Sequence, residues 1–292
     1  MGTLRYPAPE SFRTDLGLTV HIWRGAEDSG RSAGARSGGA GAAGTHAEGA
    51  GADTAAPVLL IHGFASNTLF NWVKTGWLDP SAGLDADGSG AASRTVLSVD
   101  LPGHGASKEV DPAEIRSADI LDDLHEIIAE QVGAPAALHG YSMGSRLAWQ
   151  FAHDYPRDVV SLVMGGSPVS DDVYRVDAEQ ARTWAAGGPE PADELTRRYV
   201  TVAAALPDQH LPHVVELRLS LARDHYAPED AVPSVPTLVV AGEKDPIAAG
   251  AQQLADWVRG TGAEAEFVEI PGRNHVSVLT SRDYKRAVLD FL

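Results

Sequence analysis

The most constraining feature of the chain is the stretch Gly140–Gly144, whose sequence is Gly-Tyr-Ser-Met-Gly. A short apolar run, Ala136–Leu138, precedes it, and apolar residues at helical spacing follow from Leu147 to Ala152. A strand, a sharp turn with one serine and a helix are the context in which Gly-x-Ser-x-Gly acquires a mechanism. The glycines lack Cβ atoms, so strand and helix can approach closely around a strained Ser142. A glycine-flanked turn without function is the alternative interpretation.

Apolar runs of strand length alternate with stretches of helical periodicity along the chain. This alternation predicts an α/β fold, with a mostly parallel eight-stranded sheet and helices on both faces. The first two runs alternate polar and apolar residues, which is typical of an antiparallel edge hairpin. The expected strands are Phe12–Thr14, Leu18–Trp23, Val58–Ile61, Thr95–Val99, Ala136–Leu138, Val159–Met164, Thr237–Ala241 and Glu266–Ile270.

Two kinds of segment interrupt this alternation. Residues 25–56 are rich in Gly and Ala and bury too little apolar surface to offset their ordering entropy, so we expect a disordered insert. Residues 167–233 contain successive helical stretches with no strand between them, at 178–186, 192–206 and 212–223. We therefore expect a helical cap at 167–233, inserted into an α/β core that comprises residues 1–166 and 234–292.

Composition excludes several classes of function. The 292 residues include 23 basic and 40 acidic ones, for a formal net charge of −17, which disfavours nucleic acid and anionic membranes as partners. The absence of cysteine excludes disulfides, thiolate metal sites and cysteine nucleophiles. Neither a signal peptide nor an apolar run of about 20 residues is visible, so a cytoplasmic location is expected. The oligomeric state stays open.

Ser142 needs a base and a carboxylate to become a nucleophile. Asp245 follows the Thr237–Ala241 strand, and His275 follows the last strand. The carboxyl ends of parallel strands share the sheet edge on which ligands bind, and the chain order Ser, Asp, His is the one that this architecture uses. We therefore expect Ser142, Asp245 and His275 to form a catalytic triad.

Each partner of the serine has an alternative. Asp245 precedes Pro-Ile and could merely cap the following helix, and His275 could be a surface-loop histidine. Glu243 is the nearest rival acid. Asp171 and Asp172 form a second rival, because the preceding strand also ends at the same edge.

A negatively charged oxygen that develops during acyl transfer needs two aimed donors. The backbone N–H of Met143 follows the nucleophile, and the N–H of Phe64 is best placed on the loop after Val58–Ile61. These two amides are the expected oxyanion hole.

The histidines do not indicate a metal centre. His62, His104, His139 and His153 share no ligand spacing, so neither a metal nor another cofactor is expected. We expect His62 to pack in its loop and His139 to lie at the strand end beneath the serine turn. Asp100 is expected to order the Pro-Gly-His-Gly turn that follows it.

Taken together, these motifs resemble the α/β-hydrolase family in its form with a helical cap. His62–Phe64 looks like the oxyanion-loop motif, Leu101–Gly105 like the turn after the following strand, and Gly140–Gly144 like the nucleophile elbow. The resemblance implies a serine hydrolase in which Asp245 is the acid and His275 the base. A serine nucleophile argues against the haloalkane dehalogenase and epoxide hydrolase branches, whose nucleophile is a carboxylate.

The substrate is the least constrained part of this interpretation. Trp72, Tyr141 and Trp184 are candidate substrate-binding residues, and the small-molecule substrate is expected to be a small to medium carboxylic ester or lactone. One alternative is carbon–carbon bond hydrolysis of a diketone-like ring-cleavage product with the same triad. Another is a hydrolase-fold ligand receptor in which turnover is incidental.

Overall fold

The computed structural model describes residues 8–25, 55–78, 94–170 and 175–292. Eight strands form one sheet in the order β1-β2-β4-β3-β5-β6-β7-β8. β1 and β2 form an antiparallel hairpin, β2 also pairs antiparallel with β4, and all other pairings are parallel. The predicted fold class is thus confirmed. The strands are β1 Glu10–Arg13, β2 Thr19–Trp23, β3 Val58–Ile61, β4 Val96–Asp100, β5 Ala136–Tyr141, β6 Val159–Gly165, β7 Thr237–Gly242 and β8 Ala265–Ile270.

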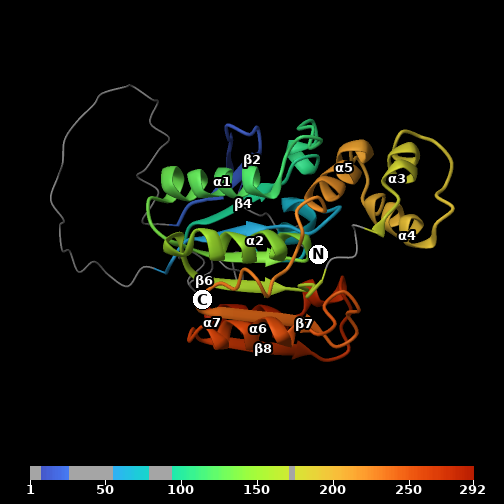
Figure 1. Cartoon of the computed structure of the whole chain (residues 1–292). Coiled ribbons are helices and arrows are strands. Elements are labelled where there is room, and N and C mark those ends of the chain that lie inside the picture. Colours follow the sequence, from blue (N-terminus) through green and yellow to red (C-terminus); the bar gives the residue numbers. More distant parts are fainter. Residues whose placement is uncertain (1–7, 26–54, 79–93, 171–174) are drawn as a thin grey trace, which may run out of the picture.

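Helices cover both faces of the sheet because successive strand residues point to opposite sides (Figure 1). Leu59 and Ile61 pack into one core cluster with apolar side chains of three helices, and Val58 and Leu60 pack into another with α7. The helices of the first face are α1 Ser117–Ile127, α2 Met143–Asp154 and α6 Gln252–Gly260, and α7 is Arg282–Phe291. Short helical turns complete the core at η1 Leu69–Val73, η2 Gly105–Ser107, η3 Ile128–Val132, η4 Pro156–Asp158 and η6 Ser277–Thr280.

Three helices follow β6 with no strand between them: α3 Ala178–Ala185, α4 Glu194–Ala203 and α5 Leu211–Leu221. Figure 1 shows them beyond the sheet edge toward which the parallel strands point. They share a separate apolar cluster. We refer to these three helices as the cap.

Helix α5 fixes the cap to the core. Arg146 of α2 is only 4% exposed, and its guanidinium donates at 2.6 Å to the carbonyls of Leu221 and of Asp224. The Asp224 carboxylate accepts from the Arg116 guanidinium and, at 2.9 Å, from the Ser117 amide. Residues 217 and 221 of α5 are also part of the first core cluster. Apolar and charged contacts therefore hold α5 against α1 and α2.

Some expectations fall on residues outside the described ranges. Residues 26–54 of the expected disordered insert and the rival acids Asp171 and Asp172 lie there. Within the described ranges, no helix combines the length and the apolar character needed to cross a membrane.

Candidate active site

Ser142 lies at the turn between β5 and α2 in a backbone conformation that non-glycine residues rarely adopt, with φ 53° and ψ −113°. The close approach around it requires glycines. A Cβ on Gly144 would lie 2.1 Å from the Ile61 carbonyl oxygen, and one on Gly140 would lie 2.5 Å from the Gly144 carbonyl oxygen. Both clash with backbone, so the sequence can form this strained turn only with glycine at these positions.

The structure brings Ser142, His275 and Asp245 into one hydrogen-bonded series. His275 Nε2 lies 3.0 Å from Ser142 Oγ, and His275 Nδ1 lies 2.8 Å from Asp245 Oδ2. With the proton on Nδ1 donated to the carboxylate, Nε2 is left as the acceptor for the serine hydroxyl. This is the arrangement in which an imidazole can take a hydroxyl proton.

Asp245 uses its two oxygens for different tasks. Oδ1 accepts from the Ile247 amide at 2.9 Å and from the Ala248 amide at 3.3 Å, while Oδ2 faces His275. The carboxylate is fully buried. The helix-capping alternative therefore describes one oxygen and the triad expectation describes the other, so the two interpretations do not compete.

The rival acid Glu243 lies in the same loop but faces elsewhere. Its carboxylate accepts from the Gly272 amide at 2.6 Å. The Lys244 amide donates to the Arg273 carbonyl at 2.8 Å, which ties the same two loops together. Glu243 thus connects the loop after β7 to the loop that carries His275.

The loop after β3 lies directly against the serine. A Cβ on Gly63 would be 3.3 Å from the Ser142 Cβ. In the described ranges, neither the Phe64 amide nor the Met143 amide has a hydrogen-bond partner. Native structures seldom leave such donors unpaired, so two that lack a partner indicate a place for a bound acceptor. These two amides are available to an oxygen bound beside Ser142.

Asn71 is a residue of this site that the sequence analysis missed. Its Oδ1 accepts from the Gly63 amide at 3.1 Å, and the side chain is 2% exposed. It thereby fixes the backbone just before Phe64. No motif marks Asn71, and only its place in the helical turn after the glycine-containing loop could have suggested it.

Two buried histidines fasten the same loop to the turn after β4. His62 Nε2 accepts from the Leu101 amide at 3.0 Å, and His104 Nε2 accepts from the Ala65 amide at 3.2 Å. Burial lowers the pKa of His62, and burial together with nearby His62 lowers the pKa of His104 to about 3. Both imidazoles are therefore neutral, as acceptors must be.

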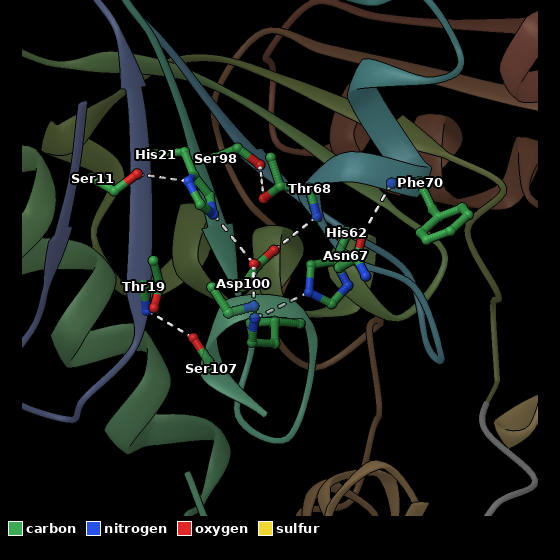
Figure 2. A network of polar contacts seen from close by, with 12 residues as sticks. Ser11, Thr19, His21, His62, Asn67, Thr68, Phe70, Ser98, Asp100 and Ser107 are labelled. Carbon is green, nitrogen blue, oxygen red and sulfur yellow. Dashed lines mark hydrogen bonds and ion pairs between the residues drawn. The ribbon is translucent and has the colours of Figure 1, made fainter. Parts of the chain in front are cut away.

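Asp100 completes this fastening, as Figure 2 shows. Its carboxylate accepts at 2.8 Å from the amides of Thr68 and of Ala106, and it lies 3.3 Å from His21 Nε2. Burial alone would raise the pKa of Asp100, but the bond to His21, the proximity of His62 and these amides lower it below its ordinary value. Asp100 orders the turn, as expected, and has no contact with Ser142.

The Phe64 side chain joins this loop to the cap. Its ring stacks on Tyr199 of α4, with centroids 5.2 Å apart and planes 7° apart. The Tyr199 hydroxyl donates in turn to the Val215 carbonyl of α5 at 2.6 Å. The loop that carries the Phe64 amide is therefore in contact with two cap helices.

Of the three candidate substrate-binding residues, two need correction. Trp72 is completely buried in the second core cluster, with its ring 4.8 Å from that of His139, so it offers no surface to a substrate. Tyr141 is 3% exposed, and its hydroxyl donates to the His275 carbonyl. Both side chains point to the α7 face of the sheet rather than out of its edge. Trp184 is partly buried and packs on the cap's apolar cluster.

In the described part of the chain, no three His, Asp or Glu side chains come together as metal ligands. The chemistry that the arrangement offers is that of a serine hydroxyl, an imidazole and a carboxylate.

A family model described as the alpha/beta hydrolase family matches residues 58–288. The dihydrolipoyllysine-residue acetyltransferase component of an acetoin cleaving system from Pseudomonas putida is 26% identical over 262 residues, 83% of this chain and 65% of that protein. A pimeloyl-[acyl-carrier protein] methyl ester esterase from Neisseria meningitidis serogroup B is 33% identical over 116 residues, 39% of this chain and 38% of that protein. The chain thus spans less than two thirds of the length of either relative.

Solved structures show the same architecture. A thermophilic esterase from Thermogutta terrifontis superimposes with a TM-score of 0.64 at 21% identity, covering 98% of each chain. A structure from work on carboxylesterases of the thaumarchaeon Nitrososphaera gargenis gives a TM-score of 0.64 at 13% identity and covers 97% of each chain. At these identities the likeness concerns the fold.

Proposed function

The chain belongs to the alpha/beta hydrolase family, and from this premise we propose that it is a serine hydrolase that cleaves a small to medium carboxylic ester or lactone. One observation carries the proposal. The Ser142 hydroxyl, the His275 imidazole and the buried Asp245 carboxylate form a hydrogen-bonded series at the strand ends. A family member with this series and two unpaired amides beside the serine has the groups that acyl transfer requires.

In the first half of the reaction, Ser142 Oγ attacks the ester carbonyl carbon while His275 Nε2 takes the hydroxyl proton. Asp245 holds the imidazole in the productive tautomer and stabilises the imidazolium that forms. The Phe64 and Met143 amides donate to the oxygen that becomes negative, and one such donor is worth about 10²–10³ in rate. His275 then gives its proton to the departing alcohol, which leaves an acyl-enzyme.

In the second half, His275 takes a proton from water, and the resulting hydroxide attacks the acyl carbonyl to give a second negatively charged intermediate, which the same two amides hold. The bond to Ser142 Oγ breaks and the serine recovers the proton from His275. The product is a carboxylic acid, and with a lactone the alcohol and the acid remain on one molecule. The ester and one water molecule are consumed, and the protein returns to its starting state.

The charge of the cap favours an uncharged substrate. Two of its arginines are paired with carboxylates of the cap itself, Arg182 with Glu216 and Arg198 with Glu194. Residues 169–233 also hold twelve acidic residues against six arginines. Such a surface disfavours a phosphate-bearing carrier or a coenzyme A ester. The methyl ester named for the Neisseria relative is compatible with an uncharged leaving group.

The test compares hydrolysis of p-nitrophenyl acetate and butyrate by the wild type and by Ser142→Ala. The variant should lose at least about 10³-fold in kcat, because the nucleophile is gone. Ser167→Ala is the matched control: Ser167 is buried, its Oγ has no hydrogen-bond partner among the described residues, and its loss should leave kcat unchanged.

Equal rates for the wild type and Ser142→Ala would end the proposal. A lactone and a β-diketone belong in the same panel, with faster cleavage of the ester or lactone expected. Preference for the diketone would instead assign carbon–carbon bond hydrolysis to the same residues.

A further inference from the structure

We propose that Tyr141, the residue before the serine, positions His275 through a hydrogen bond to its backbone and thereby sets the rate of the chemical step. The inference rests on the proposed function, since it assigns His275 the role of the base. Tyr141 acts through another residue, because its hydroxyl contacts a main-chain carbonyl and none of the reacting atoms.

The loop of His275 is also tied to the loop after β7, by the Gly272 amide on Glu243 and by the Lys244 amide on the Arg273 carbonyl, but both of these bonds precede residue 275. Its neighbours Asn274 and Val276 are exposed, the latter by 75%. Asn274 makes hydrogen bonds to residues 276 and 277, which shape the turn but do not attach it to the core. The Tyr141 hydroxyl provides a hydrogen bond from the core to the backbone of residue 275 itself.

The rings of Tyr141 and His275 pack closely together at this contact. The two rings of Tyr141 and His275 have centroids 5.4 Å apart. Both rest on Gly166, where a Cβ would lie 3.0 Å from the Tyr141 Oη and 3.1 Å from the His275 Cε1. Gly166 has a φ of 56°, so a side chain there would strain the backbone as well as crowd both rings.

Tyr141 is the donor in its bond to the His275 carbonyl, which can only accept. Burial raises the pKa of the Tyr141 phenol well above its ordinary value, and the nearby Tyr284 and Asp245 raise it further. The hydroxyl therefore keeps its proton, which the His275 carbonyl accepts.

Loss of this donor should affect catalysis more than binding. Without it, the backbone of His275 can shift, and an imidazole held at 3.0 Å from one partner and 2.8 Å from the other loses its alignment with both. Misplacement of about 1 Å is enough to cost about 10²-fold in rate. Tyr141 is 3% exposed and offers almost no surface to a substrate, so its change should affect binding little. The expected signature is a fall in kcat at constant KM.

The experiment is Tyr141→Phe, assayed with p-nitrophenyl butyrate. We expect kcat to fall at least about tenfold with KM within about twofold of the wild type. Tyr284→Phe is the matched control. Tyr284 is also fully buried, but its hydroxyl bonds His139 at 2.8 Å, so this variant should lose thermal stability and keep its kcat.

Replacement of Tyr141 by 4-aminophenylalanine restores a donor at the same place and should recover most of the lost kcat. A purely structural role would instead give a lower Tm with unchanged kcat in Tyr141→Phe, and that result would overturn the proposal. So would an equal loss of kcat in Tyr284→Phe.

A second readout does not depend on turnover. The hydrogen-bonded Nδ1 proton of His275 should give a downfield NMR resonance that Tyr141→Phe shifts or broadens and Tyr284→Phe leaves in place. If the wild type cleaves no ester, the proposed function fails, and this resonance still decides the structural claim. An unchanged resonance in Tyr141→Phe would then refute it.

Discussion

At the scale of single residues, the site depends on how one carboxylate divides its oxygens. Oδ1 of Asp245 caps the turn at residues 247 and 248, and Oδ2 accepts the Nδ1 proton of His275. The carboxylate of Glu243, two residues earlier, accepts instead from the Gly272 amide. The two acids of one loop therefore have separable tasks, one facing the imidazole and one joining two loops.

This division leads to a paired prediction. Asp245→Asn should lower kcat by about 10³–10⁴-fold, because an amide no longer selects the productive tautomer of His275 or stabilises its charged form. Glu243→Gln should keep kcat within about twofold, since a neutral oxygen can still accept from Gly272. Steady-state kinetics of both variants with one ester checks this, and a larger loss in Glu243→Gln would reverse the assignment of the acid.

The sequence predicts which residues meet at the sheet edge because each follows a strand, and parallel strands end together. Ser142, Asp245 and His275 could be placed in this way. Trp72 and Tyr141 could not, because the direction of a side chain on a turn or at a strand end depends on the face to which neighbouring elements pack. Asn71 could not be predicted either, because its partner is a backbone amide that no sequence pattern identifies.

At the scale of elements, periodicity locates helices well and their ends less well. The stretch predicted at 192–206 is α4 Glu194–Ala203 in the structure. Its N-cap is Asp193, whose carboxylate accepts from the Thr196 amide at 2.7 Å. An aspartate at this position is a signal that can be read in the sequence. Its end has no such signal. The turn η1 Leu69–Val73 is π-helical, and a periodicity of 3.6 residues cannot reveal that winding.

The attachment of α5 to α2 predicts the effect of a change at Arg146. Arg146→Met keeps most of the side-chain volume but leaves the carbonyls of residues 221 and 224 without their buried donor. We expect a loss of about 2–4 kcal/mol in the free energy of unfolding and faster amide exchange in α5. Arg198→Met, which removes an exposed pair with Glu194 on the cap, is the control and should cost less than about 1 kcal/mol.

Urea denaturation and hydrogen exchange by mass spectrometry measure both effects. Equal stability of the wild type and Arg146→Met would show that apolar packing alone holds α5 in place.

At the scale of the whole molecule, the strand order could not be obtained from the sequence. Alternation predicts a parallel sheet, but it does not say that β3 lies between β4 and β5, because that pairing joins residues far apart in the chain. The order matters for the site. It puts the loop after β3 next to the serine turn after β5, so that Gly63 lies against Ser142.

The buried histidines predict how stability depends on pH. Burial lowers the pKa of His139 to about 3, and burial with nearby His62 does the same for His104, against an ordinary value of 6.5. The unfolded chain therefore binds more protons than the folded one between about pH 6.5 and 3, so stability is full above this range and falls as the pH falls through it. Each histidine should cost about 2 kcal/mol between pH 7 and pH 5.

Urea denaturation at pH 7 and pH 5 measures this loss. In His139→Gln the difference between the two pH values should be smaller by about 2 kcal/mol, because one proton-binding group of the unfolded chain is gone. An undiminished difference in this variant would place the acid sensitivity in other groups.

One contact links the cap to the loop that lies against Ser142. The ring of Phe64 stacks on Tyr199, while Gly63, the residue before it, lies against Ser142. A substrate that displaced α4 on entering would also displace the backbone of Phe64, because the two are in contact. On the proposed function, we therefore expect the bulk of a substrate to affect kcat as well as KM.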